Sequence, residues 1–158
     1  GRPRPAPRGG SLGAPLNSRS VRRQVNAMGT GFFVRLNPET TSIDLNMDGR
    51  ALALNDGALT ARCEELKVRP ILNFLSPDAE TLRGVLDSAG MYDVPIPPEA
   101  WFSPAEGLQT LSSLIPLVEA EREWFSHPDA LLADLRRIQD ILVQAAAAGA
   151  EWNLDAEL

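Results

Sequence analysis

The most specific chemical pattern in the chain is a run of alternating oxygen-bearing side chains, Asp44-Leu45-Asn46-Met47-Asp48-Gly49. It matches the first half of a calcium-binding loop, in which alternate Asp and Asn oxygens converge on the ion and a glycine allows a sharp turn. The last position of such a loop carries a Glu that binds through both oxygens, but this chain has Asn55 there. Asp44, Asn46 and Asp48 are therefore candidate calcium ligands without the residue that completes the set.

A strand followed by a turn is the second interpretation of the same run. In Ser42–Met47, apolar residues alternate with polar ones, which places the apolar side chains on one face of a strand. Asp48-Gly49 then predicts a turn. No amphipathic helix precedes the run, as a calcium-binding helix–loop–helix requires. We therefore favour the strand and turn, and we predict no metal site.

The chain has few side chains that could act as a nucleophile or a general base, because it contains one His and one Cys. His127 stands between Ser126 and Pro128, where it is expected to cap a helix, and no second His is present to found a metal site. Cys63 falls on the apolar stripe of a predicted helix, so we expect a buried, unreactive thiol. The chain has no phosphate-binding Walker loop and no C-x-x-C pair. We predict no catalytic residue and no cofactor.

Two aromatic pairs, Trp101-Phe102 and Trp124-Phe125, flank a predicted helix. Either they fix the ends of that helix to the core, or they form exposed anchors for a partner. Together with the Pro-rich loop between Tyr92 and Pro98, they mark the candidate binding surface.

Carboxylates are numerous, but their spacing is typical of solvated surfaces. Glu119, Glu121 and Glu123 alternate around Arg122 at a predicted helix end. A hydrolase with paired carboxylates needs two acids that face each other in a cleft and differ in pKa. A cleft that holds Asp or Glu beside a Trp would favour such an enzyme or a small-ligand protein.

The elements that must position these residues are strands at both ends of the folded part and helices between them. Gly31–Leu36 is aromatic and β-branched and is bounded by turn residues, which predicts a strand. After Gly149 the apolar residues alternate, at Trp152, Leu154, Ala156 and Leu158, which predicts a terminal strand with an acidic outer face. We expect this terminal strand to pair beside the N-terminal strands.

Capping residues and apolar spacings of three and four predict helices in the middle of the chain. They are expected at residues 56–67, 77–90, 104–116 and 128–149. Ser76 is expected to cap the second, and Ser103 with Glu106 forms a capping box for the third. Pro116 is expected to kink or end the third, because proline lacks an N–H, and Gly149 is expected to end the fourth.

Charge divides the chain at Met28. Residues 1–27 hold six arginines and no acid, whereas residues 28–158 hold nine basic and twenty-one acidic residues, a net charge near −12. We expect residues 1–27 to be a disordered, basic, Pro/Gly/Arg-rich tail and residues 28–158 to be a single acidic globular domain. The tail is interpreted as sequence upstream of a natural start at Met28, as a targeting segment, or as a basic arm.

The acidic globule resembles a family of small bacterial proteins without an established activity. The residues that carry the resemblance are Met28–Phe33, Asp48–Ala53, Trp101–Leu108 and Ala147–Trp152. The resemblance covers nearly all of residues 28–158. It implies a start at Met28 and a cytoplasmic bacterial origin, and it transfers no functional residue.

These observations predict an α+β fold: a small, mainly antiparallel sheet made by the N-terminal strands and the C-terminal strand, packed by three to five helices. We expect a non-enzymatic acidic module that binds a protein with a basic surface, as an adaptor, a regulator or an immunity-type inhibitor. A negative globule repels nucleic acid, and no apolar run spans a membrane. The alternatives are a carboxylate-based enzyme or small-ligand protein, and a subunit of a larger assembly with a basic N-terminal arm.

Overall fold

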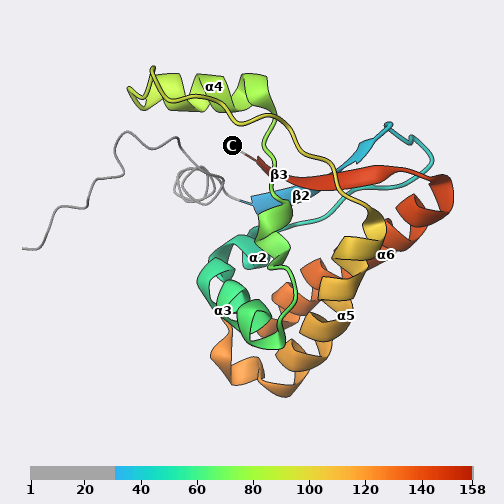
Figure 1. Cartoon of the computed structure of the whole chain (residues 1–158). Helices are drawn as coiled ribbons and strands as arrows, with labels where there is room; N and C mark the ends of the chain where they lie inside the picture. Colours follow the sequence, from blue (N-terminus) through green and yellow to red (C-terminus); the bar gives the residue numbers. More distant parts are fainter. Residues whose placement is uncertain (1–30, 158) are drawn as a thin grey trace, which may run out of the picture.

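The computed structural model describes residues 31–157. The predicted tail and the start at Met28 lie outside these residues. Within them the order of elements is β2 (Gly31–Asn37), α2 (Arg50–Leu54), α3 (Asp56–Leu66), η1 (Ile71–Phe74), α4 (Ala79–Ser88), α5 (Pro104–Ala120), η2 (Arg122–Trp124), α6 (Pro128–Ala148) and β3 (Glu151–Glu157). This is a small α+β fold, as the sequence predicts (Figure 1).

The sheet of the described residues joins the two ends of this part of the chain. β2 and β3 are antiparallel, with Gly31 opposite Glu157 and Asn37 opposite Glu151. The predicted pairing of the terminal strand with the N-terminal strand is confirmed. Apolar residues on one face of both strands, such as Val34 and Leu154, are buried in the core.

The second predicted N-terminal strand, Ser42–Met47, is wrong. This stretch has no strand partner among the described residues, although its burial alternates as expected: Ile43 is buried and Asp44 is exposed. The reason is that its carbonyl groups bond elsewhere. The guanidinium of Arg137 on α6 donates to the carbonyl oxygens of Asp44 and Asn46, at 2.6 and 2.7 Å. The segment is therefore fixed to a helix instead of a sheet.

Helices α5 and α6 pack side by side beneath the sheet (Figure 1). The predicted apolar stripe of α6 is buried throughout: Leu131, Leu132, Leu135, Ile138, Ile141, Leu142 and Ala145. At the start of α5, Ser103 and Glu106 form the predicted capping box. Gly107 allows Trp152 of β3 to approach, because a Cβ at Gly107 would lie 2.3 Å from the indole ring.

Two local predictions about helix ends are corrected. Helix α4 is capped by the carboxylate of Asp78, which accepts from the Thr81 N–H, and not by Ser76. The hydroxyl of Ser76 instead accepts from the Ala100 N–H at 2.8 Å. Helix α5 continues through Pro116 to Ala120. Pro116 is on the exposed side, so the carbonyl that it leaves without an N–H donor can bond to water.

Candidate binding groove beside strand β2

An open groove of about 1200 Å³ lies along one side of β2. It is lined by residues 33–37 of β2, by the segment that follows (residues 39–47, called the return segment below) and by Trp101. In Figure 1 the return segment leaves the far end of β2, turns, and runs back towards α2. The groove is therefore bordered by one strand and one extended segment that do not pair with each other.

The backbone of β2 on the groove side is mostly unpaired with other backbone of the described residues. Along a strand, successive residues direct their backbone groups to opposite edges. In β3, Trp152 and Leu154 direct theirs away from β2: Trp152 exchanges two hydrogen bonds with Phe102, both 2.9 Å, and the Leu154 carbonyl accepts from the Ser76 N–H. Leu36 and Val34 lie opposite these two residues, so their backbone N–H and carbonyl groups also point away from the partner strand.

Only the first residue of this edge is satisfied. The Phe32 N–H donates to the Gly49 carbonyl at 3.3 Å. Among residues 31–157, no backbone hydrogen bond reaches Val34 or Leu36 on this side. Val34 and Leu36 are nevertheless 1% and 4% exposed, so these backbone groups lie beneath the surface of the groove.

The turn that closes one end of the groove is held by a buried carboxylate. Asp134 of α6, which is 4% exposed, accepts from the Gly49 N–H at 3.1 Å and from the Leu52 N–H at 3.2 Å. It thereby caps α2 from another helix. Burial raises the pKa of Asp134, against the lowering effect of these backbone donors. The sequence analysis missed this residue, and its signal was an acid on the buried stripe of α6.

Gly49 must be a glycine at this turn. Its φ is 76°, and a Cβ would lie 1.9 Å from the Phe32 carbonyl oxygen. The predicted Asp-Gly turn is therefore present, and it fixes where the return segment meets β2.

The candidate calcium ligands are not gathered around a common point. Asp44 forms an ion pair with Arg137 at 3.5 Å, and its other oxygen accepts from the Asn46 N–H. Asp48 pairs with Arg50 at 2.7 Å, and this hydrogen bond lowers the pKa of Asp48. No cluster of three or more His, Cys, Asp or Glu in the described part of the chain is placed to hold a metal ion.

At the mouth of the groove, Arg35 of β2 organises a cluster on the outer face of the sheet. It contacts Asp155 at 3.2 Å and Glu99 at 3.1 Å, and its guanidinium lies 5.1 Å from the centre of the Trp101 ring. Burial raises the pKa of Asp155, while the Ala156 N–H and Arg35 oppose the rise. The positive charge of Arg35 is thus matched within the protein, and the half-buried Trp101 is held at the groove.

Each aromatic pair has one ring that anchors a helix end in the core and one ring at the surface. Phe125 is buried, and Phe102 packs edge-on against Phe74 with ring centres 5.0 Å apart, so both fix helix ends. Trp101 lines the groove, and Trp124 is 65% exposed. The sequence pattern located both pairs, but it did not predict that the Phe of each pair packs against the core while the Trp lies at the surface.

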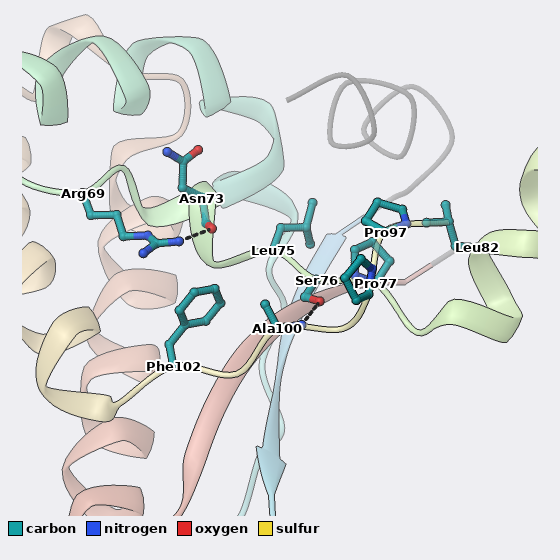
Figure 2. A pocket seen from close by; sticks show the side chains of 10 residues that line it. Arg69, Asn73, Leu75, Ser76, Pro77, Leu82, Pro97, Ala100 and Phe102 are labelled. Atoms are coloured by element: carbon teal, nitrogen blue, oxygen red, sulfur yellow. Dashed lines mark hydrogen bonds between the residues drawn. The ribbon is translucent and has the colours of Figure 1, made fainter. Parts of the chain in front are cut away.

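The predicted Pro-rich surface forms a second, smaller pocket of about 200 Å³ (Figure 2). Pro77, Pro97 and Leu82 line one side, and Arg69 and Phe102 line the other. The Arg69 guanidinium lies over the Phe102 ring, 4.5 Å from its centre. This volume is below the roughly 300–1,000 Å³ typical of small-molecule sites.

The single Cys and His lie apart from both hollows. Cys63 is fully buried on α3, and burial raises the pKa of its thiol, which keeps the group protonated. His127 occupies the position before α6 with φ 49°, but its side chain makes no capping hydrogen bond. The predicted location of His127 is confirmed, and the predicted capping bond is absent.

Comparison with known proteins adds no relative: no family model, no curated protein and no solved structure matches this chain. No helix in residues 31–157 is both long enough and apolar enough to cross a membrane. The family resemblance and the bacterial, cytoplasmic origin stay predictions.

Proposed function

We propose that this protein is a non-enzymatic binding module that takes a protein partner with a basic surface, in a cytoplasmic adaptor, regulator or immunity-type role. The observation that carries the proposal is the groove beside β2, which combines an aromatic ring, apolar side chains and exposed acidic side chains. An open hollow of about 1200 Å³ is large enough for a short segment of polypeptide, since it exceeds the roughly 300–1,000 Å³ of typical small-molecule sites.

The charge of the groove and of the whole domain favours a basic partner. The ionisable side chains that line the groove are Arg35, Glu39 and Asp44. Arg35 is already matched by Asp155 and Glu99, whereas Glu39 is exposed and forms no ion pair among the described residues. The surrounding residues 28–158 carry a net charge near −12, which attracts and orients a basic partner over a Debye length of roughly 8–10 Å.

The enzyme alternative has one observation in its favour, namely that Trp101 shares the groove with Glu39 and Asp44. Both acids are exposed, however, and Asp44 is paired with Arg137. The buried acids, Asp134 and Asp155, bond backbone N–H groups of the fold. The groove therefore supports binding better than acid–base chemistry. The assembly-subunit alternative depends on residues 1–27 and stays a prediction.

The test uses the full-length chain and three synthetic peptides in which Val alternates with Lys, Ser or Glu. Binding is measured by calorimetry at low and at high salt. We expect the Lys peptide to bind most tightly and the Glu peptide least, with the Lys peptide weakened by salt. The proposal fails if the Glu peptide binds as tightly as the Lys peptide, or if none binds at low salt.

A further inference from the structure

Arg69 is set apart from the other arginines of residues 31–157, because it donates no hydrogen bond to a carboxylate. Each of the others donates to an Asp or Glu oxygen. The acid beside Arg69 is Glu106, at 4.0 Å, and the other oxygen of Glu106 accepts from the Ser103 N–H in the capping box. The guanidinium of Arg69 donates to the Asn73 carbonyl at 3.2 Å. Because a guanidinium has five N–H donors, Arg69 keeps donors for a further acceptor.

The guanidinium of Arg69 is also fixed in place. It lies over the rings of Phe74 and Phe102, 4.7 and 4.5 Å from their centres. The backbone carbonyl of Arg69 accepts from the hydroxyl of Thr110, a buried residue of α5, at 2.7 Å. A charge that is positioned before binding loses little conformational entropy when a ligand arrives, which favours an anion at this point.

This fixed charge borders the smaller pocket, whose volume is about 200 Å³ (Figure 2). Across the pocket from Arg69 lie the apolar side chains of Pro77, Pro97 and Leu82. An apolar cavity of roughly 150 Å³ holds one benzene molecule. The pocket therefore has room for an apolar group about the size of one ring, with a cation at its edge.

A second donor in the pocket wall is the hydroxyl group of Ser76. This residue is 6% exposed, and its oxygen accepts from the Ala100 N–H at 2.8 Å (Figure 2). Within residues 31–157, the Ser76 hydroxyl donates to no acceptor. A buried donor without an acceptor is unfavourable, and an oxygen atom of an occupant would satisfy it.

We propose that the pocket beside Arg69 binds a small carboxylate whose apolar part is about the size of one ring. Arg69 donates to the carboxylate, and Pro77, Pro97 and Leu82 cover the apolar part. One guanidinium balances one negative charge, and the apolar wall disfavours a phosphate, which has oxygens on every side. A free acid and the C-terminal residue of a polypeptide both supply this chemistry. The pocket shares no lining residue with the groove beside β2, so this site goes beyond the proposed function and does not depend on it.

The first test compares benzoate with benzamide, which has the same shape and no charge, on the full-length chain. Calorimetry at physiological salt is suitable, because the negative charge of the domain is then screened beyond roughly 8 Å. We expect benzoate to bind with a Kd of about 0.1–1 mM, and benzamide to bind about tenfold or more weakly. The amide NMR signals of Asn73, Ser76 and Phe102 should shift on binding. Equal affinities, or shifts confined to other parts of the chain, would overturn the proposal.

A pair of variants tests the role of the guanidinium. Arg69→Gln removes the charge at the pocket and should weaken benzoate binding about tenfold or more. Arg136→Gln removes the same charge from the exposed surface of α6 and should leave the affinity unchanged. Unchanged binding by a folded Arg69→Gln variant would contradict the proposal. If that variant does not fold, the comparison of benzoate with benzamide still decides, because it needs no substitution.

Two short Gly/Ser peptides that end in Phe identify the source of the carboxylate. One has a free C-terminal carboxylate and the other has a C-terminal amide. If the free-carboxylate peptide shifts the same amide signals as benzoate and the amidated peptide does not, the pocket accepts the end of a polypeptide chain. If benzoate alone binds, the ligand is a free acid. If neither benzoate nor the free-carboxylate peptide binds, the proposal is wrong, and the proposed function is unaffected.

Discussion

Strands β2 and β3 have the same length and pair along all of it, yet their surroundings differ. β3 is bonded on both edges, to β2 on one side and to Ser76 and Phe102 on the other. Beyond Phe32, the outer edge of β2 bonds no other backbone among the described residues. The difference indicates that backbone hydrogen bonding in this sheet is concentrated in β3, and that β2 is held on its outer side by the burial of its side chains.

The largest expected effect tests the β3 side of this comparison. Replacing the fully buried Trp152 by Ala removes the ring that stacks on Phe74 and packs over Gly107, and should cost about 3–5 kcal/mol of unfolding free energy. Trp124→Ala is the matched control, because that ring is 65% exposed, and it should cost less than about 1 kcal/mol. Chemical denaturation measures both. Equal losses would contradict the account.

The next effect concerns the turn that joins the return segment to β2. Gly49→Ala places a Cβ in a left-handed conformation against the Phe32 carbonyl and should cost about 2–4 kcal/mol. Gly57→Ala is its control, since a Cβ there meets nothing within 4 Å and Ala favours a helix. Thermal melts should show Gly49→Ala melting lower and Gly57→Ala unchanged or higher. A stable Gly49→Ala variant would mean that the turn is not fixed as described.

Asp134→Asn tests the buried cap of the same turn. An Asn oxygen can accept from only one of the two N–H donors, Gly49 and Leu52, so the variant should lose about 1–3 kcal/mol. Because the pKa of Asp134 is raised in the folded state, the native protein binds its proton more tightly than the unfolded chain does. Ionisation of Asp134 therefore lowers stability as the pH rises from the ordinary value of 3.8 through the folded-state pKa.

The deficit of Asp134→Asn, which cannot titrate, should accordingly shrink over that pH interval and stay constant above it. Denaturation curves at a series of pH values measure this deficit. A deficit that grows with pH would show that backbone hydrogen bonding, and not burial, dominates at Asp134.

The smallest effect is at the rim of the groove. Glu39→Lys reverses an exposed charge and should weaken binding of the Lys/Val peptide by a few-fold, because a rim charge contributes roughly 0–1 kcal/mol. Glu64→Lys makes the same charge change on the exposed surface of α3 and should alter the affinity less. Calorimetry at low salt separates the two. Identical affinities would indicate that overall charge, and not the groove, attracts the peptide.

Local patterns predicted much of the fold. The capping box at Ser103 and the apolar stripe of α6 depend on neighbours within one element, so the sequence shows them directly. The terminal strand is present, but its predicted acidic outer face is wrong, because Asn153 and Asp155 are buried as well. The failures involve distant partners. The alternation in Ser42–Met47 correctly indicated which side chains are buried, but it cannot show that Arg137 takes the carbonyl groups.

The site was predicted only in part, for the same reason. Trp101 and the Pro-rich loop were singled out as binding elements, and both line hollows. The groove itself arises because a predicted strand does not pair with β2, and no pattern within either segment reports that. Asp134 lies 85 residues from Gly49 in the chain, so its role in the turn follows from the fold alone.

The central claim is that the two edges of β2 differ, and hydrogen exchange read residue by residue along β2 of the free, full-length chain tests it most directly. We predict an alternation in which the amides of Phe33 and Arg35, which face β3, are strongly protected and those of Val34 and Leu36 exchange much faster. Uniform protection of all four amides would contradict the account, because it would mean that the groove edge of β2 is already hydrogen-bonded.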